Sequence, residues 1–343
     1  MSLKGNRVGS LGRSSIIIVN YNGKSFLNDC LVSIRSSEAS HEEIIVVDNA
    51  SSDGSRDYIK KEFPYIKLIA LDNNYGFALA NNIGAEVAAG KYLIFLNNDT
   101  VVSPGWLETL CDTLSSDPTV GVAGSKLLLL SMPERVNSAG TNIAFDGRGY
   151  DIGFMDSDSD RYNTPGPRGG VCGAAMMVRK KEFLSLGGFD PMYFMYFEDV
   201  DLCWRYWLSG YRVLYVPASL VYHRLGATAG SNRDSPLRVF CSTRNSMFNI
   251  VKNYELPNMA LALAFSMMYH AVRLQTFLLS MQFESAGAIL AAYGSLAKHM
   301  PQILRKRDNV QRTRKVSDKY LFENSLVVPL RVAAKEYFRL RKA

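Results

Sequence analysis

The chain has 343 residues, 47% hydrophobic and 21% charged, so it can bury a large core and is not intrinsically disordered. Lys and Arg outnumber Asp and Glu by 39 to 32, and residues 298–343 hold 13 of the basic and 4 of the acidic side chains, a local charge of +9. A basic tail after an apolar stretch favours an anionic lipid surface over nucleic acid, with a solvated basic helix as the alternative.

The five cysteines are odd in number and form no C-x-x-C pair, which predicts free thiols in a reducing compartment rather than a zinc or redox site. Residues 1–13 are basic and rich in Gly and Ser, and they lack the apolar core of a secretory signal. We therefore expect a flexible N-terminus that is neither a signal peptide nor a membrane anchor.

The first third of the chain alternates short β-branched runs with helical patterns. Strands are predicted at 15–20, 43–48, 66–71 and 92–96, and helices at 26–36, 55–63 and 78–89. This alternation predicts an α/β fold with a doubly wound, mainly parallel sheet in a catalytic domain that ends near residue 253.

Polar residues follow three of these strands, in the clusters Asn20-Tyr21-Asn22, Asp48-Asn49 and Asn97-Asn98-Asp99. Ligands of such sheets bind beyond the carboxyl ends of the strands, so the clusters predict a nucleotide pocket. Asp48 taken alone is equally typical of an Asx turn, and 96–100 (LNNDT) of a polar β-turn. The same LNNDT run also suits a hard divalent cation with its bound phosphates.

The middle of the chain contains a long polar stretch. Residues 131–170 are rich in Gly, Asp, Ser and Pro, which predicts a long surface excursion or mobile loop over the site. Strands are predicted again at 171–178 and 211–216, on either side of a helix at 199–209. A loop after the second of these strands is expected to hold Tyr222 and His223.

Residues 187–205 combine an apolar run, PMYFMYF, with an acidic helix start. Glu198, Asp199 and Asp201 favour a helix N-terminus by themselves. The apolar run PMYFMYF before them should desolvate these carboxyls and raise the pKa of at least one, as a general base requires. His223 follows an apolar strand and should emerge at its end, although a lone histidine is more often structural.

Residues 254–343 are predicted to form an amphipathic and basic helical region. Within 259–281 a narrow polar stripe interrupts an apolar sequence, which argues against a clean membrane span. The stripe consists of Ser266, His270, Arg273, Thr276 and Ser280. Such a helix favours the membrane surface, and packing in a homodimer or small bundle is the alternative.

Six ordered motifs resemble the family 2 glycosyltransferases of the GT-A fold, in particular the rhamnosyltransferase-like branch. They are SIIIVNYNG, VVDNASSDGS, NYGFALANNIGA, LNNDT, GGFDPMYFMYFEDVDLCWR and VYH, spread in the expected order over residues 14–253. The resemblance implies a GT-A domain with a Rossmann-like nucleotide-binding half and an acceptor half within residues 14–253. It implies transfer of a sugar from a UDP-, dTDP- or GDP-linked donor to an acceptor hydroxyl. It also implies that Asn20, Asp48 and Asn49 hold the base and ribose, with Asp48 accepting from a base N–H.

The full donor-side set implied by the resemblance comprises Val19, Asn20, Tyr21, Asp48, Asn49, Ser51, Asn74, Gly76, Asn82, Asn97 and Asn98. LNNDT resembles the Asp-X-Asp motif with Asn97 in the first acidic position, which leaves Asp99 as the carboxylate ligand. His223 resembles the histidine ligand of the same cation, Mn²⁺ or Mg²⁺. The cation would neutralise the departing diphosphate.

On the acceptor side, Asp199 resembles the catalytic base of an inverting reaction. Glu198 would orient the acceptor or support the base, Arg205 would anchor the acidic cluster, and Gly173 would permit close approach of the acceptor. The apolar 259–281 segment and the basic tail favour a lipid-linked or cell-surface glycan acceptor, which predicts a cytoplasmic protein peripheral to the inner face of the cell membrane.

Two other functions compete with this interpretation. A sugar nucleotidyltransferase shares the sheet and crevice, but it usually opens with a Gly-rich phosphate loop, and SIIIVNYNGKS is poor in Gly. A non-catalytic sugar-nucleotide-binding protein would have lost the base, whereas Asp199 and His223 are both present.

Overall fold

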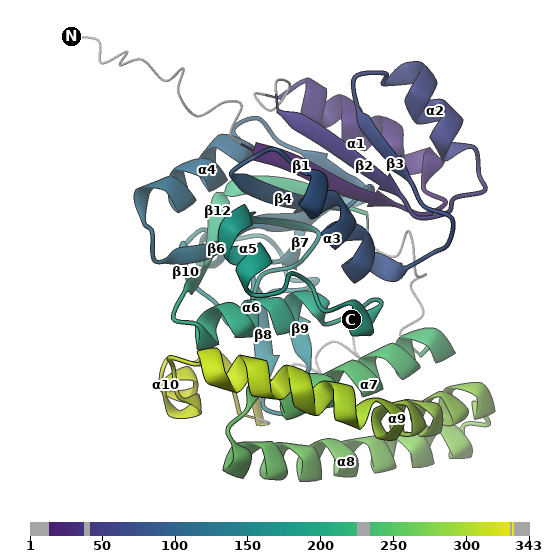
Figure 1. Ribbon diagram of the computed structural model, residues 1–343, viewed down its shortest axis with the longest axis vertical. Helices are drawn as coiled ribbons and strands as arrows, with labels where there is room; N and C mark the ends of the chain where they lie inside the picture. The colour runs from purple at the N-terminus through teal and green to yellow at the C-terminus, as the bar shows by residue number, and fades with distance from the viewer. Residues whose placement is uncertain (1–13, 38–41, 225–233, 330, 333–343) are drawn as a thin grey trace.

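The computed structural model describes residues 14–37, 42–224, 234–329 and 331–332. The expected flexible segment 1–13 and the last part of the basic tail lie outside the described residues. The structure consists of a large twisted sheet with helices on both faces, and a layer of long helices on one side of it (Figure 1).

The large sheet has the strand order β10-β12-β6-β11-β4-β1-β2-β3, with β5 paired to β12 and β7 to β6. Its strands are β1 (Ser14–Asn20), β2 (Glu43–Asp48), β3 (Lys67–Ala70), β4 (Tyr92–Leu96), β5 (Thr100–Val102), β6 (Val120–Leu129), β7 (Met132–Ser138), β10 (Gly166–Pro167), β11 (Ala175–Arg179) and β12 (Arg212–His223). Strands β3, β2, β1 and β4 are parallel, whereas β11 is antiparallel to both β4 and β6. The predicted α/β sheet is confirmed, with a parallel first half and a mixed second half.

The helices of the sheet domain are α1 (Lys24–Arg35), α2 (Ser55–Glu62), α3 (Gly76–Val87), α4 (Trp106–Ser116), α5 (Lys180–Ser185) and α6 (Glu198–Leu208). Side chains alternate between the two faces of each strand, so β1 contributes side chains to two hydrophobic cores. Ile17 packs in the core that includes α3 and α6, while Ile16 and Ile18 pack in the core that includes α1 and α4. Because β1 and β2 are covered on both faces, the runs SIIIVN and EIIVVD are almost wholly buried, whereas the edge strand β3 is partly exposed.

The segment 131–170 is ordered, so the prediction of a mobile loop is wrong. It contributes β7, β8 (Thr141–Ala144), β9 (Gly149–Asp151), η2 (Asp160–Tyr162) and β10. Strand β8 pairs with β9 and, from near the other end of the chain, with β13 (Val327–Val328). This small sheet buries Ile143 and Asp146, because partners distant in sequence complete it. Turn residues within the hairpins gave the stretch its loop-like composition.

Two strand boundaries also differ from expectation. Strand β11 begins at Ala175 instead of Val171, and β12 runs on to His223 instead of ending near Val216. Strand β12 is prolonged past an irregularity between Val216 and Leu220 because β6 and β5 pair with its far end. Tyr222 and His223 therefore lie in a strand, not in the predicted loop.

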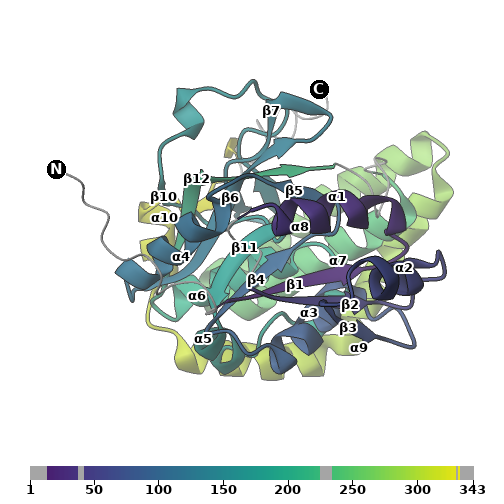
Figure 2. The same cartoon turned by 90° about the horizontal axis from the view of Figure 1, so that it is seen from above.

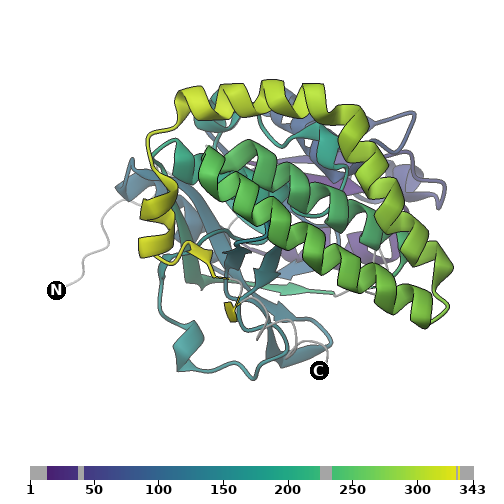
Figure 3. The same cartoon turned by 90° about the horizontal axis from the view of Figure 1, so that it is seen from below.

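The C-terminal region forms α7 (Pro236–Asn253), α8 (Leu256–Leu279), α9 (Phe283–Thr313) and α10 (Asp318–Glu323). Seen from above, the sheet and its helices lie over this layer, and from below α8 and α9 cross the molecule, with α9 bent partway along (Figures 2 and 3). Pro301 lies inside α9 and removes one helical hydrogen bond, which accounts for the bend. Most of α7 is buried between α9 and the sheet domain.

Helix α8 turns part of its polar stripe inward. Ser266 and His270 are buried, and His270 Nδ1 lies 3.1 Å from the Tyr293 hydroxyl of α9. The outer face is apolar instead, with Met268 and Val272 each 59% exposed. Among the described residues, no helix combines the length and hydropathy needed to cross a bilayer.

Candidate active site

The donor end of the site is built where β1 and β2 finish. The two strands are in parallel register, so their last residues, Asn20 and Asp48, lie side by side. Asn20 Nδ2 donates to Asp48 Oδ2 at 3.0 Å and to Ser51 Oγ at 3.1 Å, and Asn98 Nδ2 donates to Asn20 Oδ1 at 2.8 Å. Three of the predicted polar clusters are thus brought into one hydrogen-bonded group.

Asp48 is fully buried, and its charge is balanced by a residue that sequence reasoning missed. Arg56 Nε donates to Asp48 Oδ1 at 2.5 Å, and Ser51 N–H donates to the same oxygen at 3.1 Å. Burial by itself would raise the pKa of Asp48, but the hydrogen bonds from Ser51, Arg56 and Asn20 outweigh it and hold the pKa below its usual value. The carboxylate is therefore ionised and fixed in place at neutral pH.

A second amide pair links β2 to the start of α3. Asn49 Nδ2 donates to Asn74 Oδ1 at 2.8 Å and to the Gly76 carbonyl at 3.2 Å, while Asn49 Oδ1 accepts from Tyr75 N–H at 2.8 Å. Beside this pair the other donor-side residues line the strand end: Val19 is half-buried and Tyr21 is exposed. The first turn of α3 is thereby held against the nucleotide-side strand ends.

The LNNDT run and His223 meet, as the resemblance implied. His223 Nε2 lies 3.3 Å from Asp99 Oδ1 and 3.3 Å from Asn97 Nδ2. His223 Nδ1 is 2.6 Å from Asn137 Oδ1, an acceptor, so a neutral imidazole would carry its proton on Nδ1 and direct its Nε2 lone pair toward the Asp99 carboxylate. Within the described residues Asp99 Oδ1 is buried and makes no hydrogen bond.

Two facing lone pairs repel unless a cation lies between them, so this pair fits a divalent ion. Adjacent ligands of an octahedral ion are about 3 Å apart, close to the observed separation of Asp99 and His223. Asp99 and His223 are two such ligands, and the described part of the chain contains no cluster of three or more His, Cys, Asp or Glu side chains that could hold a metal. Asn137, which fixes the histidine tautomer from β7, was missed because the segment 131–170 was interpreted as a loop.

The predicted base lies at the N-terminus of α6. Asp199 is half-buried, and its Oδ2 accepts from Gly173 N–H at 2.9 Å. The neighbouring Ala174 carbonyl accepts from Asn97 N–H at 2.9 Å, so the same turn joins the base to the LNNDT run. Burial raises the pKa of Asp199, and the Gly173 N–H offsets only part of that rise. Gly173 thus anchors the predicted base through its backbone N–H.

Glu198 is buried beside Asp199, and burial followed by the Asp199 charge raises its pKa to about 8. Its Oε2 is buried and makes no hydrogen bond within the described residues. The expected desolvation of the Glu-Asp pair is therefore present.

Asp151 is a further carboxyl that the sequence did not single out. It ends β9, and Thr141 Oγ1 donates to its Oδ1 at 3.4 Å. Burial raises the pKa of Asp151 to about 6, hydrogen bonding from Ser138 opposes the rise, and the Asp199 charge adds to it. The prediction that the segment 131–170 reaches the site is in this respect correct.

Two predicted site residues have structural roles instead. Asn82 donates to the Phe189 carbonyl at 2.7 Å and accepts from Phe189 N–H at 3.0 Å, so its amide is used to join α3 to the 187–190 turn. Arg205 is buried and binds Asp201 at 2.8 Å together with the carbonyls of Leu186 and Gly188. It anchors the acidic helix, as expected, but it faces the protein interior and not an acceptor.

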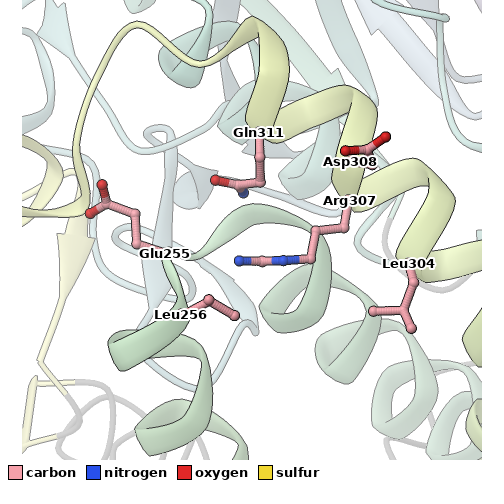
Figure 4. Close-up of a pocket in the computed structure, with 6 residues that line it drawn as sticks. All are labelled: Glu255, Leu256, Leu304, Arg307, Asp308 and Gln311. Carbon is pink, nitrogen blue, oxygen red and sulfur yellow. The ribbon is translucent and has the colours of Figure 1, made fainter.

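A pocket of about 470 Å³ lies elsewhere, between the start of α8 and α9, and is lined by Glu255, Leu256, Leu304, Arg307, Asp308 and Gln311 (Figure 4). Arg307 Nη1 donates to the carbonyls of Val251 and Tyr254 at 2.7 and 2.6 Å, and Gln311 Nε2 donates to the Lys252 carbonyl at 2.9 Å. These side chains cap the C-terminal carbonyls of α7 and tie α9 to it.

Residues 15–183 match the pattern of glycosyl transferase family 2. The chain is 24% identical over 245 residues to the N-acetylglucosaminyl-diphospho-decaprenol L-rhamnosyltransferase of Mycobacterium tuberculosis (strain CDC 1551 / Oshkosh), covering 65% of this chain and 79% of that protein. The family match spans the first four of the six motifs named above, from SIIIVNYNG to LNNDT, and the motifs at 187–205 and 221–223 lie beyond it.

Two solved structures share the fold. GalNAc-T7, solved with UDP, GalNAc and Mn²⁺, has a TM-score of 0.57 at 20% identity, over 71% of this chain and 48% of that one. Residues 1–349 of S. aureus TarS, solved with UDP, have a TM-score of 0.54 at 15% identity, over 88% of this chain and 90% of that one. The second match extends over most of both chains.

Proposed function

Because this chain belongs to glycosyl transferase family 2 and is a nucleotide-sugar-dependent glycosyltransferase, we propose that it inverts the transferred sugar, with Asp199 as general base. The acceptor oxygen attacks the anomeric carbon as its proton passes to Asp199. The bond from that carbon to the diphosphate breaks, and the nucleoside diphosphate leaves with the bonding electrons. Asp199 supports this role because its carboxylate is desolvated, basic and oriented by Gly173 N–H.

Replacing the base is the decisive test. Asp199→Asn should lower the rate of nucleoside diphosphate release from the donor by about 10²–10⁴-fold and leave donor affinity unchanged. Asp57→Asn, on the exposed face of α2, is the control and should retain the full rate. A near-normal rate for Asp199→Asn would remove Asp199 from the proposed role.

Asp99 and His223 would hold a divalent cation, with Asn97 and Asn98 at the same strand end. A bound Mn²⁺ or Mg²⁺ would supply positive charge to the diphosphate of the donor. GalNAc-T7 was solved with Mn²⁺ and UDP, and here the orphaned Asp99 oxygen and the fixed Nε2 lone pair favour the same kind of ion.

A thermal-shift screen of UDP-, dTDP- and GDP-sugars, each with and without Mn²⁺, tests the donor class and the metal together, because binding to the native state raises its apparent stability. One nucleotide series should stabilise the protein, and more strongly with Mn²⁺. His223→Gln should abolish the Mn²⁺ increment, whereas His299→Gln on α9 should not. Equal stabilisation with and without metal would contradict the assignment of Asp99 and His223.

We propose in addition that the acceptor is lipid-linked and that the protein reaches it from the surface of an anionic bilayer. The mycobacterial relative is named for a decaprenol-linked acceptor. The outer face of α8 is apolar, with Leu261, Met268 and Val272 all exposed, and it belongs to the same C-terminal region as the +9 tail. Apolar insertion with nearby basic side chains is the usual chemistry of such docking.

Co-sedimentation with vesicles tests this surface in the full chain. Binding should be stronger with anionic than with neutral phospholipid, and the triple variant Leu261→Gln, Met268→Gln, Val272→Gln should lose it. Leu184→Gln, an exposed leucine on α5, is the control. If the triple variant changes only the oligomeric state measured by light scattering, the face is a contact between copies of this chain and the membrane proposal fails.

A further inference from the structure

The segment Tyr193–Phe197 connects the short η3 turn (Pro191–Tyr193) to α6, and it ends directly before the acidic pair. Phe194, Tyr196 and Phe197 have φ values of 62°, 68° and 66°, in the left-handed region that side chains other than glycine rarely adopt. Three such residues in four positions need support from outside the segment. The conformation is therefore imposed by hydrogen bonds that other parts of the chain make to the carbonyls of Tyr193–Phe197.

Helix α7 supplies most of that support through one amide. Asn245 Nδ2 lies 3.0, 2.9 and 2.7 Å from the carbonyl oxygens of Tyr193, Met195 and Tyr196, so its two N–H groups are shared among three acceptors. Asn245 Oδ1 accepts from Arg244 Nε at 2.9 Å, which fixes the orientation of the amide. Asn245 is fully buried, so water does not compete for these bonds.

The two remaining carbonyls connect the segment to both sides of the active site. The Phe194 carbonyl accepts from Phe77 N–H of α3 at 2.7 Å, next to Gly76 of the donor-side amide group. The Phe197 carbonyl accepts from Asp201 N–H of α6 at 2.9 Å. One strained segment therefore joins the donor-side helix to the helix that carries Asp199.

Helix α7 is itself held firmly. Lys252 of α7 binds Asp190 at 2.7 Å and Asp201 at 2.9 Å. Arg307 and Gln311 of α9 cap the C-terminal carbonyls of α7. The support thus runs from the C-terminal helices, through α7, to the segment that precedes the base.

We propose that Asn245 is a positioning residue for the transfer reaction, which sets the place of Asp199 relative to the donor by holding the backbone of Tyr193–Phe197. The proposal rests on the function assigned to Asp199. It predicts that loss of the Asn245 amide lowers turnover while the donor pocket stays intact, because misplacement of a catalytic group by about 1 Å can cost about 10²-fold in rate.

The test compares Asn245→Ser with Asn249→Ser, one helical turn along α7. Asn249 is equally buried and makes two bonds, to the Tyr193 hydroxyl at 2.6 Å and to the Gly147 carbonyl at 2.8 Å, but none to the carbonyls of Tyr193, Met195 or Tyr196. For each variant we would measure thermal stability, affinity for the selected nucleoside diphosphate with Mn²⁺, and the rate of nucleoside diphosphate release at saturating donor.

Asn245→Ser should lower the rate by about 10-fold or more with donor affinity within about twofold of the parent. Asn249→Ser should lose stability but keep the rate of the folded protein. Equal rate losses in the two variants, or no loss in either, would overturn the proposal. If Asn245→Ser does not fold, Arg244→Met is the milder variant, since Arg244 Nη2 donates to the Met192 and Tyr193 carbonyls from a half-buried position.

Asp199→Asn is measured in the same series. If it retains full activity, the proposed function fails whatever Asn245 does. If it loses turnover while Asn245→Ser does not, only the positioning role of Asn245 fails.

Discussion

The carboxyl groups on the proposed donor side and on the proposed base side of the site differ in how many hydrogen-bond donors surround them and in the direction of their pKa shifts. On the donor side, Asp48 is satisfied by neighbours that donate to it, and its pKa is lowered. On the base side, the carboxyls of Glu198, Asp199 and Asp151 lie close together with few donors, and their pKa values are raised. The proposed donor pocket is thus pre-formed, whereas burying the carboxyls on the proposed base side has a cost in stability that the surrounding helices must offset.

The ionic network that supports the base side gives the largest expected effect. Burial alone would raise the pKa of Asp190, but Lys252 and Lys306 outweigh it and hold it below its usual value. Lys252→Met removes the buried cation that Asp190 and Asp201 share, leaving Arg205 on Asp201 and the more exposed Lys306 on Asp190, and should lower the free energy of unfolding by about 3–5 kcal/mol. Urea denaturation measures this. Lys306 is 36% exposed and also binds Asp190, so Lys306→Met should cost about 1 kcal/mol or less. Equal costs would mean that burial does not govern the network.

On the donor side, Asp48→Asn should weaken donor binding by roughly 10- to 100-fold, because a hydrogen bond to a charged group contributes about 1.5–3 kcal/mol. The rate at saturating donor should stay within a few-fold of the parent, since the base is untouched. Calorimetric titration measures the donor affinity, and steady-state kinetics measures the rate at saturating donor. Asp72→Asn, an exposed aspartate bonded to the Tyr75 hydroxyl, should change neither, and a large fall in the saturated rate of Asp48→Asn would show that the two sides are not separable.

Gly76 lies where the two sides touch. Its φ is +78°, and an added Cβ would clash with the Phe194 carbonyl and ring. Gly105 has a φ of +80° with nothing within 4 Å of such a Cβ. Gly105→Ala should cost about 1 kcal/mol of stability from strain alone, whereas Gly76→Ala should cost more and also lower both donor affinity and turnover. Equal effects at the two positions would show that the contact between α3 and Tyr193–Phe197 contributes nothing to donor binding or turnover.

Glu198 also predicts a pH dependence of stability. Its folded-state pKa of about 8 exceeds the usual value of 4.5, so the folded state binds the proton more tightly. The resulting stability is fully present below about pH 4.5 and is lost as pH rises toward about 8, by up to about 1.4 kcal/mol per pH unit. Glu198→Gln, which stays neutral, should flatten this part of the profile in denaturation experiments. Asp48, with its lowered pKa, contributes in the opposite direction and is common to both proteins. Parallel profiles for parent and variant would show that Glu198 is ionised in the fold.

The sequence by itself determined the parallel half of the sheet and the donor residues at its edge. Asn20, Asp48 and Asn97 each follow a short apolar strand, and consecutive parallel strands end at one edge, so local pattern is sufficient to gather them. The helix start at Glu198–Asp199 and the desolvation of that pair could also be predicted from the sequence, because the apolar run precedes them directly in the chain.

Only the tertiary structure decided the other half of the site. Asn137 and Asp151 lie beside the predicted site residues from a segment with loop-like composition, and Asn245 of α7 contacts the segment that precedes Asp199. Contacts distant in sequence create all three arrangements. Asn82 and Arg205 match the expected motifs but bind backbone and buried partners instead. Local periodicity specifies which face of an element is buried, whereas the partner of a buried polar group depends on which distant segment completes its hydrogen bonds.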